Sequence, residues 1–89
     1  MTSLLLRPDG DGPLYGQVYR AIRAEILSGL LAPGHRLPPS RALAADLHTS
    51  RNVVVIAYEQ LAAEGYVESR MGSGTFVASA LPGRLADHE

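Results

Sequence analysis

One stretch decides the fold of this 89-residue chain: residues 50–77, SRNVVVIAYEQLAAEGYVESRMGSGTFV. Its first part has the period of an amphipathic helix, because one face repeats every three or four positions. That face comprises Val54, Tyr58, Leu61 and Gly65. Ser50 suits the N-cap, where its hydroxyl can accept a hydrogen bond from an unpaired N–H group. Gly65 suits the end of a helix, since glycine tolerates the left-handed conformation found there. The sequence therefore predicts a helix over residues 51–65.

The second part of the stretch predicts a β-hairpin. Residues 66–70 and 74–78 are rich in aromatic and β-branched residues, and the turn between them, MGSG, contains two glycines. A glycine-rich tip with Arg70 at its base lets the backbone approach a nucleic-acid groove closely. Alternatively, the glycines only satisfy the geometry of the turn. We favour the first interpretation because the hairpin directly follows a helix whose N-terminus carries an exposed Arg-Asn pair.

That Arg-Asn pair is the main candidate for a binding function. Arg51 and Asn52 lie at the start of the predicted helix, on the side away from its apolar face. The N-terminus of a helix is positively polarised, and it attracts phosphate groups. Arginine and asparagine side chains also form paired hydrogen bonds with the edges of guanine and adenine. This end of the helix therefore indicates contact with nucleic acid.

Composition limits the other possibilities. A chain of 89 residues forms one small domain, and it has no cysteine for disulfides or thiolate metal sites, which is compatible with a reducing cytosol. The net charge of −1 gives no overall attraction to nucleic acid, and all eight positive residues are arginines. Several acids lie outside the candidate contact region: Asp9, Asp11, Asp87 and Glu89. We therefore expect a locally basic surface, with weak affinity from charge alone.

A first helix is predicted over residues 13–29. Pro13 suits a first helical position, which needs no N–H group. Apolar residues then recur every four positions: Leu14, Val18, Ile22 and Ile26. Tyr15 and Tyr19 widen this stripe, and we interpret them as core or core-edge residues rather than as base-stacking ones. Gly29 ends the helix.

The middle of the chain predicts a second, shorter helix over residues 40–47. Before it, the connector contains a possible short strand at residues 35–37, which ends at two prolines. Three residues separate the second helix from the third, which is the arrangement of a helix-turn-helix. The Asp/Gly/Pro-rich head, residues 1–12, is expected to be flexible. Residues 78–89 lose all periodicity and are interpreted as a linker or disordered tail.

No pattern of catalytic or metal-binding residues emerges. There is no phosphate-binding loop, no cysteine and no carboxylate pair near a histidine. His35 and His48 have no partners at metal-ligand spacing, so both are expected on the surface. No apolar run approaches the roughly 20 residues of a membrane span. We therefore expect a chain that is not an enzyme, has no cofactor or metal of its own, and acts in the cytoplasm.

Several short motifs, in a fixed order and spacing, resemble a known family. They are Leu37-Pro38, Ser40-Arg41-Ala42-Leu43-Ala44, Ser50-Arg51-Asn52, Ala57-Tyr58-Glu59-Gln60-Leu61, Glu64-Gly65-Tyr66 and Gly72-Ser73-Gly74-Thr75-Phe76-Val77. Together they resemble the winged helix-turn-helix domain of GntR-type bacterial transcription regulators, and most closely its MocR (PdxR-like) branch. The resemblance covers about residues 13–77, and the combination is far more specific than any single motif.

The resemblance implies a mainly α fold with three helices and a small two-stranded β-wing. It implies sequence-specific binding of double-stranded operator DNA, with helix 51–65 in the major groove and wing 70–74 toward the minor groove. The intact regulators of this branch continue past a linker into an aminotransferase-like domain that holds pyridoxal 5′-phosphate. We therefore interpret this chain as an excised DNA-binding domain. The full regulator is expected to be a homodimer, and the fragment a monomer or weak dimer.

The resemblance also implies individual roles. Arg41 matches a DNA-contacting position at the start of the second helix, residues 50–53 match the contacting end of the recognition helix, and Met71 and Gly72 match the wing tip. The expected DNA-binding residues are Arg41, Ser50, Arg51, Asn52, Val53, Arg70, Met71, Gly72 and Ser73. Arg51 and Asn52 would read bases, whereas Arg41 and Arg70 would hold phosphates or the minor groove.

Three positions depart from the family pattern. Pro39 replaces a common serine cap, so either Ser40 caps the second helix or that end is less stable. Val53 replaces a common threonine, and Val55 replaces an arginine found in many relatives. With Ile56, these valines form an apolar group near the reading end of the helix. Val53 could meet thymine methyl groups. Alternatively, the group packs on another protein, and the domain is a winged-helix interaction module.

Overall fold

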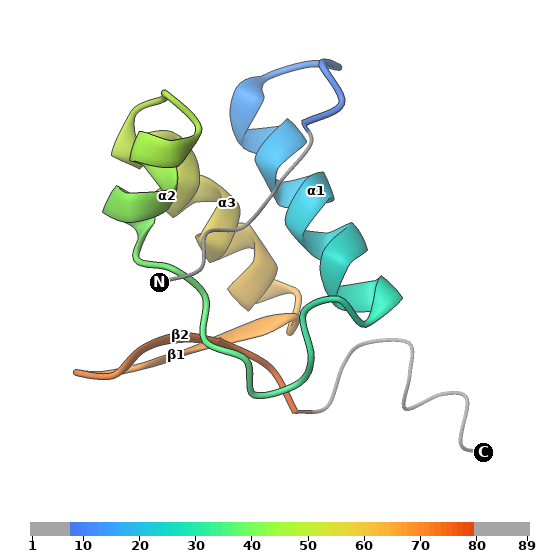
Figure 1. Cartoon of the computed structure of the whole chain (residues 1–89), viewed down its shortest axis with the longest axis vertical. Helices are drawn as coiled ribbons and strands as arrows, with labels where there is room; N and C mark the ends of the chain where they lie inside the picture. The colour runs from blue at the N-terminus through green and yellow to red at the C-terminus, as the bar shows by residue number, and fades with distance from the viewer. Residues whose placement is uncertain (1–7, 80–89) are drawn as a thin grey trace.

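The computed structural model describes residues 8–79, and its elements follow the predicted order (Figure 1). They are α1 (Leu14–Ser28), α2 (Ser40–Asp46), α3 (Arg51–Ala63), β1 (Val67–Arg70) and β2 (Gly74–Val77). The two strands pair antiparallel. The predicted fold of three helices and a β-wing is therefore confirmed, and every element begins and ends within two residues of its predicted bounds.

The core lies between α1 and α3, and α2 packs across α3. Its fully buried side chains come from every layer: Val18, Ile22, Ile26, Leu37, Leu43, Val54, Leu61 and Val77. Among the described residues, no charged or polar side chain is buried. Tyr19 joins this core as predicted, but Tyr15 is 41% exposed, so the prediction of a core position was wrong for it. The packed face of α1 begins one turn later, at Val18.

The connector between α1 and α2 pairs with β2 of the wing, which also pairs with β1. Arg36 bridges Phe76 in antiparallel fashion. Leu37 N–H donates to the Thr75 carbonyl at 2.8 Å, and Val77 N–H donates to the His35 carbonyl at 2.8 Å. In place of the short strand expected at residues 35–37, the structure has an isolated β-bridge at Arg36, and its flanking hydrogen bonds join the connector to β2.

The turn between α2 and α3 is held by backbone geometry. His48 has φ +55°, in the left-handed region that non-glycine residues rarely adopt. This conformation lets Thr49 N–H donate to the Ala44 carbonyl at 2.9 Å, which pairs one of the last carbonyls of α2. Gly65 occupies the equivalent place after α3, with φ +87°, at no steric cost.

Part of the predicted head forms a loop against α1. Arg20 makes an ion pair with Asp9, with 2.8 Å between Nε and Oδ2. The Gln17 side chain donates to the Gly12 carbonyl at 2.7 Å. The Arg20 guanidinium lowers the pKa of Asp9 to about 2. The rest of the predicted head, residues 1–7, and most of the predicted linker, residues 80–89, lie outside the described residues.

Candidate nucleic-acid interface

The N-terminus of α3 is open to an anionic ligand. Ser50 occupies the N-cap position, with φ −76° and ψ 152°, but its hydroxyl makes no capping hydrogen bond. The prediction that this hydroxyl caps the helix was therefore wrong, although the position was right. Within residues 8–79, the N–H groups of Arg51 and Asn52 have no acceptor. Unpaired N–H groups at a positively polarised helix end can bind a phosphate oxygen.

The side chain of Arg51, which the sequence predicts to read bases, contacts α2. Arg51 is exposed, and its Nε donates to Ser40 Oγ at 3.2 Å. Ser40 is the first residue of α2, and Pro39 stands at the N-cap without a capping bond. Of the two outcomes expected at this end, capping by Ser40 is therefore excluded, because its hydroxyl lies inside the first turn and faces Arg51. The contact links the Arg51 side chain to the first residue of α2.

A shallow hollow connects these helix ends. Its lining is mostly small side chains between two arginines: Pro39, Ser40, Arg41, Ala42, Ala45 and Arg51. Arg41 is exposed, as is Arg51. Two guanidinium groups around a floor of small residues offer forked donors to a phosphate group. The structure thus brings two of the predicted contact residues, Arg41 of α2 and Arg51 of α3, to one hollow.

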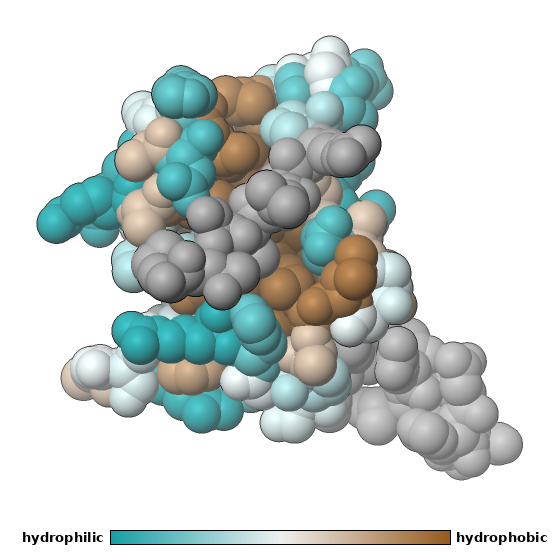
Figure 2. Space-filling view, viewed as in Figure 1, coloured by the Kyte–Doolittle hydropathy of each residue, from teal (hydrophilic) through white to brown (hydrophobic). Residues whose placement is uncertain are grey.

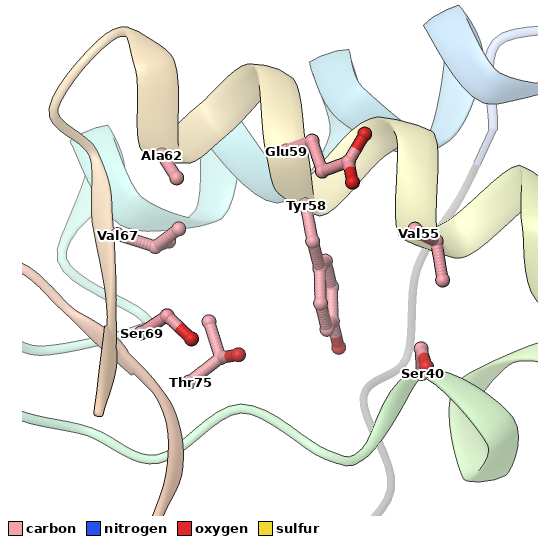
Figure 3. A pocket seen from close by; sticks show the side chains of 8 residues that line it. All are labelled: Ser40, Val55, Tyr58, Glu59, Ala62, Val67, Ser69 and Thr75. Carbon is pink, nitrogen blue, oxygen red and sulfur yellow. The ribbon is translucent and has the colours of Figure 1, made fainter. Parts of the chain in front are cut away.

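A second groove of about 220 Å³ separates α3 from the wing (Figure 3). Its lining mixes hydroxyl and apolar side chains with one carboxylate: Ser40, Val55, Tyr58, Glu59, Ala62, Val67, Ser69 and Thr75. Figure 3 shows the Tyr58 ring crossing from α3 toward the connector. There the Tyr58 hydroxyl donates to the Pro38 carbonyl at 2.7 Å. Burial raises the pKa of Tyr58 above its usual value.

The three apolar residues near the reading end of α3 do not form one patch. Val53 and Val55 are two positions apart, which places them about 200° apart around a helix. Val53 packs partly against the core, whereas Val55 lines the groove beside the wing. Ile56 lies four residues after Asn52, so those two share the outward side. Ile56, rather than Val53, is thus the apolar neighbour of Asn52.

The wing tip projects on the same side of the molecule as α2 (Figure 1). The Met71 side chain is fully exposed, and Gly72 and Ser73 are exposed beside it. Ser73 N–H donates to the Arg70 carbonyl at 2.9 Å, which closes the turn. The Arg70 guanidinium lies 4.4 Å from the centre of the Phe76 ring. The predicted wing residues therefore form one exposed tip, separate from the hollow at the helix ends.

Sequence reasoning missed two polar residues of this region. Ser40 was considered only as a cap, although it contacts Arg51. Arg36 was placed in the connector with no functional role, but the pairing with β2 brings it onto the wing. The possible strand at residues 35–37 was the only signal for Arg36. Figure 2 shows hydrophilic side chains projecting beside α2 and lying along the wing, whose tip is paler, while hydrophobic surface gathers near α1.

Other kinds of site have little support. Residues 8–79 contain no group of three or more potential metal ligands, and both histidines in this range are exposed, as predicted. No helix in that part of the chain has the length and apolar character needed to cross a membrane. The chain has no lysine, the residue to which enzymes attach pyridoxal 5′-phosphate. The residues present therefore do not fit that cofactor.

Comparison with known proteins gives a consistent result. Residues 14–77 match the model of the family described as bacterial regulatory proteins, gntR family. The chain is 53% identical over 79 residues to the probable rhizopine catabolism regulatory protein MocR of Rhizobium meliloti, a match that covers 89% of this chain and 16% of that protein. It is 42% identical over 74 residues to the pyridoxine biosynthesis transcriptional regulator PdxR of Corynebacterium glutamicum, covering 83% of this chain and 16% of that protein.

A solved complex matches the fold. The DNA-binding domain of AraR, in complex with operator ORX1, superposes with a TM-score of 0.72 and 30% sequence identity. The match covers 88% of this chain and 96% of that one. By contrast, the chain spans about one sixth of the length of the two curated relatives.

Proposed function

Because the chain belongs to the GntR family of bacterial regulatory proteins, we propose that it reads operator DNA by placing α3 in the major groove and the wing toward the minor groove. The chain is a GntR-type DNA-binding domain of the MocR-like branch of transcription regulators, not an enzyme. One observation carries the proposed orientation. Arg41 and Arg51 stand exposed beside an uncapped helix N-terminus, and neither is within 4.0 Å of a described carboxylate.

The proposed roles follow from position. Arg51 and Asn52 reach the base edges, because they extend from the first turn of α3. Arg41 and the N–H groups at the start of α3 hold phosphates, which fixes the orientation of the domain without reading sequence. Ile56 lies beside Asn52 on the outward side of α3, where an apolar side chain can contact a thymine methyl group, whereas Val53, which packs partly against the core, can reach such a group only with its exposed edge.

The wing has a separate proposed role. Arg70 and the tip residues Met71, Gly72 and Ser73 enter or border the adjacent minor groove, where backbone and arginine donors recognise mainly its width and acceptor pattern.

The assembly proposed for the full regulator is a homodimer on paired half-sites, whose spacing mirrors the symmetry of the protein. The 89-residue chain alone is proposed to be a monomer or weak dimer. Sedimentation at micromolar concentration tests this, and a tight dimer would contradict it. A regulator of bacterial genes acts where the chromosome is, so we place it in the cytoplasm. Any pyridoxal 5′-phosphate is assigned to a further domain of the parent.

Selection from randomised duplex DNA tests the proposed reading. The wild-type domain should enrich a short half-site. Arg51→Ala should weaken binding to that half-site by about 1–3 kcal/mol and relax the preference at one base position. Arg23→Ala, on α1 and remote from the interface, is the matched control and should enrich the wild-type half-site. Unchanged selection by Arg51→Ala would refute the assignment. A domain that enriches no DNA but captures a protein in a salt-insensitive way would favour the interaction-module alternative.

A further inference from the structure

The β-bridge between the connector and β2 places Arg36 on a defined face of the wing. Arg36 and Phe76 stand directly opposite each other. The hydrogen bonds lie on either side of this pair, so the two side chains approach closely and point to the same face. The next residue, Leu37, is 2% exposed and points into the core. Since side chains alternate along a strand, Arg36 points away from the core.

The same face also holds Arg70. Phe76 pairs with Glu68 across β1, so Arg36, Phe76 and Glu68 form one row on one face. Arg70 is two residues beyond Glu68 and therefore shares this face, and its guanidinium lies over the Phe76 ring. We call this surface the outer wing face and define it as Arg36, Glu68, Arg70 and Phe76. Its two arginines come from the two segments that flank β2, the connector and β1.

The opposite face of the wing is different. Val67 and Val77 are buried there, and Ser69 and Thr75 line the groove beside α3. No arginine lines that groove, and it contains the Glu59 carboxylate. The positive charge of the wing is therefore on the face turned away from α3.

Arg36 extends along the wing toward its tip. A Cβ atom built on Gly74 would lie 3.0 Å from Arg36 Nε and 3.4 Å from its Nη2. The guanidinium thus rests on the backbone of Gly74, at the start of β2. Arg36 is exposed, and within residues 8–79 no carboxylate lies within 4.0 Å of it. Arg70, in contrast, has Glu68 at 3.8 Å.

We propose that the outer wing face is a second phosphate-binding surface, which holds the DNA strand on the far side of the minor groove. This inference rests on the proposed function. The minor groove is only about 6 Å wide, so a hairpin at its mouth has a phosphate strand beside each face. The face toward α3 can offer hydroxyl groups to one strand. The outer wing face offers two guanidinium groups, which bind phosphate oxygens in a forked geometry, to the other.

The carboxylate of Glu68 reduces the net positive charge of the outer wing face. This carboxylate shares the face with both arginines and repels phosphate, and it also engages Arg70. Arg36 is therefore the principal phosphate ligand of the outer wing face. Removal of the Glu68 charge should strengthen DNA binding, whereas removal of the Arg36 charge should weaken it.

Salt titrations of DNA binding test the proposal. Four proteins are compared on the enriched half-site and on a scrambled duplex: wild type, Arg36→Gln, Glu68→Gln and the control Arg23→Gln. One phosphate contact contributes about −0.9 to the slope of log K against log salt concentration. Across the tenfold range from 1 M to 0.1 M salt, this contribution corresponds to about an eightfold change in affinity. Arg36→Gln should therefore bind both duplexes about five- to tenfold more weakly, with a salt slope reduced in magnitude by about one. The ratio of the affinities for the half-site and the scrambled duplex should not change.

The remaining outcomes separate the inference from the proposed function. Glu68→Gln should bind both duplexes more tightly than wild type, a gain that loss of folding cannot produce. Thermal unfolding by circular dichroism checks that Arg36→Gln is folded. If the wild type binds but Arg36→Gln matches Arg23→Gln in affinity and slope, the outer wing face makes no phosphate contact and the inference is overturned alone. If Arg36→Gln loses only the half-site, Arg36 reads bases, which also overturns it. If the wild type binds neither duplex at low salt, the proposed function and the inference fall together.

Discussion

Removal of a single hydroxyl group from Tyr58 tests how the wing and the connector are held to α3. The Tyr58 side chain is 8% exposed, and its hydroxyl donates to the Pro38 carbonyl at 2.7 Å. A typical hydrogen bond contributes about 0.5–1.5 kcal/mol, and leaving the partly buried Pro38 carbonyl without a partner adds to the loss. We therefore expect Tyr58→Phe to lower the free energy of unfolding by about 1–2 kcal/mol. For a domain of this size, each kcal/mol lowers Tm by about 4–8 °C.

Urea unfolding followed by circular dichroism measures this change. Tyr15→Phe is the matched control, because Tyr15 is 41% exposed and makes no hydrogen bond within residues 8–79. The control should stay within about 0.5 kcal/mol of wild type. If Tyr58→Phe is no less stable than Tyr15→Phe, the hydroxyl does not hold the connector and the reasoning fails.

The same hydroxyl predicts a pH dependence. Burial raises the pKa of Tyr58, whereas the pKa of a tyrosine in the unfolded chain is about 10. Above that pH the unfolded chain releases a proton that the folded protein retains, so stability falls as pH rises. The pKa of Tyr19 is also raised by burial, and it contributes to the decline in both proteins. Wild type should therefore lose stability more steeply than Tyr58→Phe between about pH 10 and 11. Parallel curves would contradict the assignment.

Three further predictions concern backbone strain and charge. His48→Gly should stabilise the domain by about 0.5–1 kcal/mol in urea unfolding, because relief of left-handed strain at φ +55° outweighs the added freedom of the unfolded chain; a loss of stability would show that the His48 side chain makes a favourable contact. Gly74→Ala should destabilise it by about 1–2 kcal/mol or more, since Gly74 has φ +118° and a Cβ there would meet Arg36; an unchanged Tm would count against this. The Asp9 carboxyl should titrate by NMR with a pKa of about 2, and this pKa should return toward the usual range in Arg20→Gln; a normal Asp9 pKa in wild type would mean that the loop does not hold the ion pair in solution.

The elements could be predicted because their signals are local. The apolar stripe of α3 repeats within one helix, and Gly65 marks its end within two residues. The wing follows from two β-rich runs around a glycine turn. Arg51 and Asn52 were predicted to be exposed at the start of α3, and they are; their contact with DNA stays a prediction.

Features that depend on tertiary structure could not be predicted. The pairing of Arg36 with Phe76 joins residues 40 positions apart, and nothing local to Arg36 indicates its partner. The bond between Arg51 and Ser40 likewise depends on how the two helices pack. The role of Ser50 was predicted from residue type alone, which does not determine the direction of its hydroxyl.

The left-handed backbone conformation at His48 could not be predicted either, but for a different reason. A histidine gives no signal for the left-handed conformation that glycine would have indicated.

The most direct test of DNA reading by this domain is an amide NMR titration with the enriched half-site duplex. We expect the largest shifts in three segments: residues 39–42, residues 50–53 and residues 70–74. The part of α1 around Arg23 should shift little, because α1 lies on the side of the molecule away from α2 and the wing tip (Figure 1). Shifts centred on α1, or no shifts at low salt, would contradict the account.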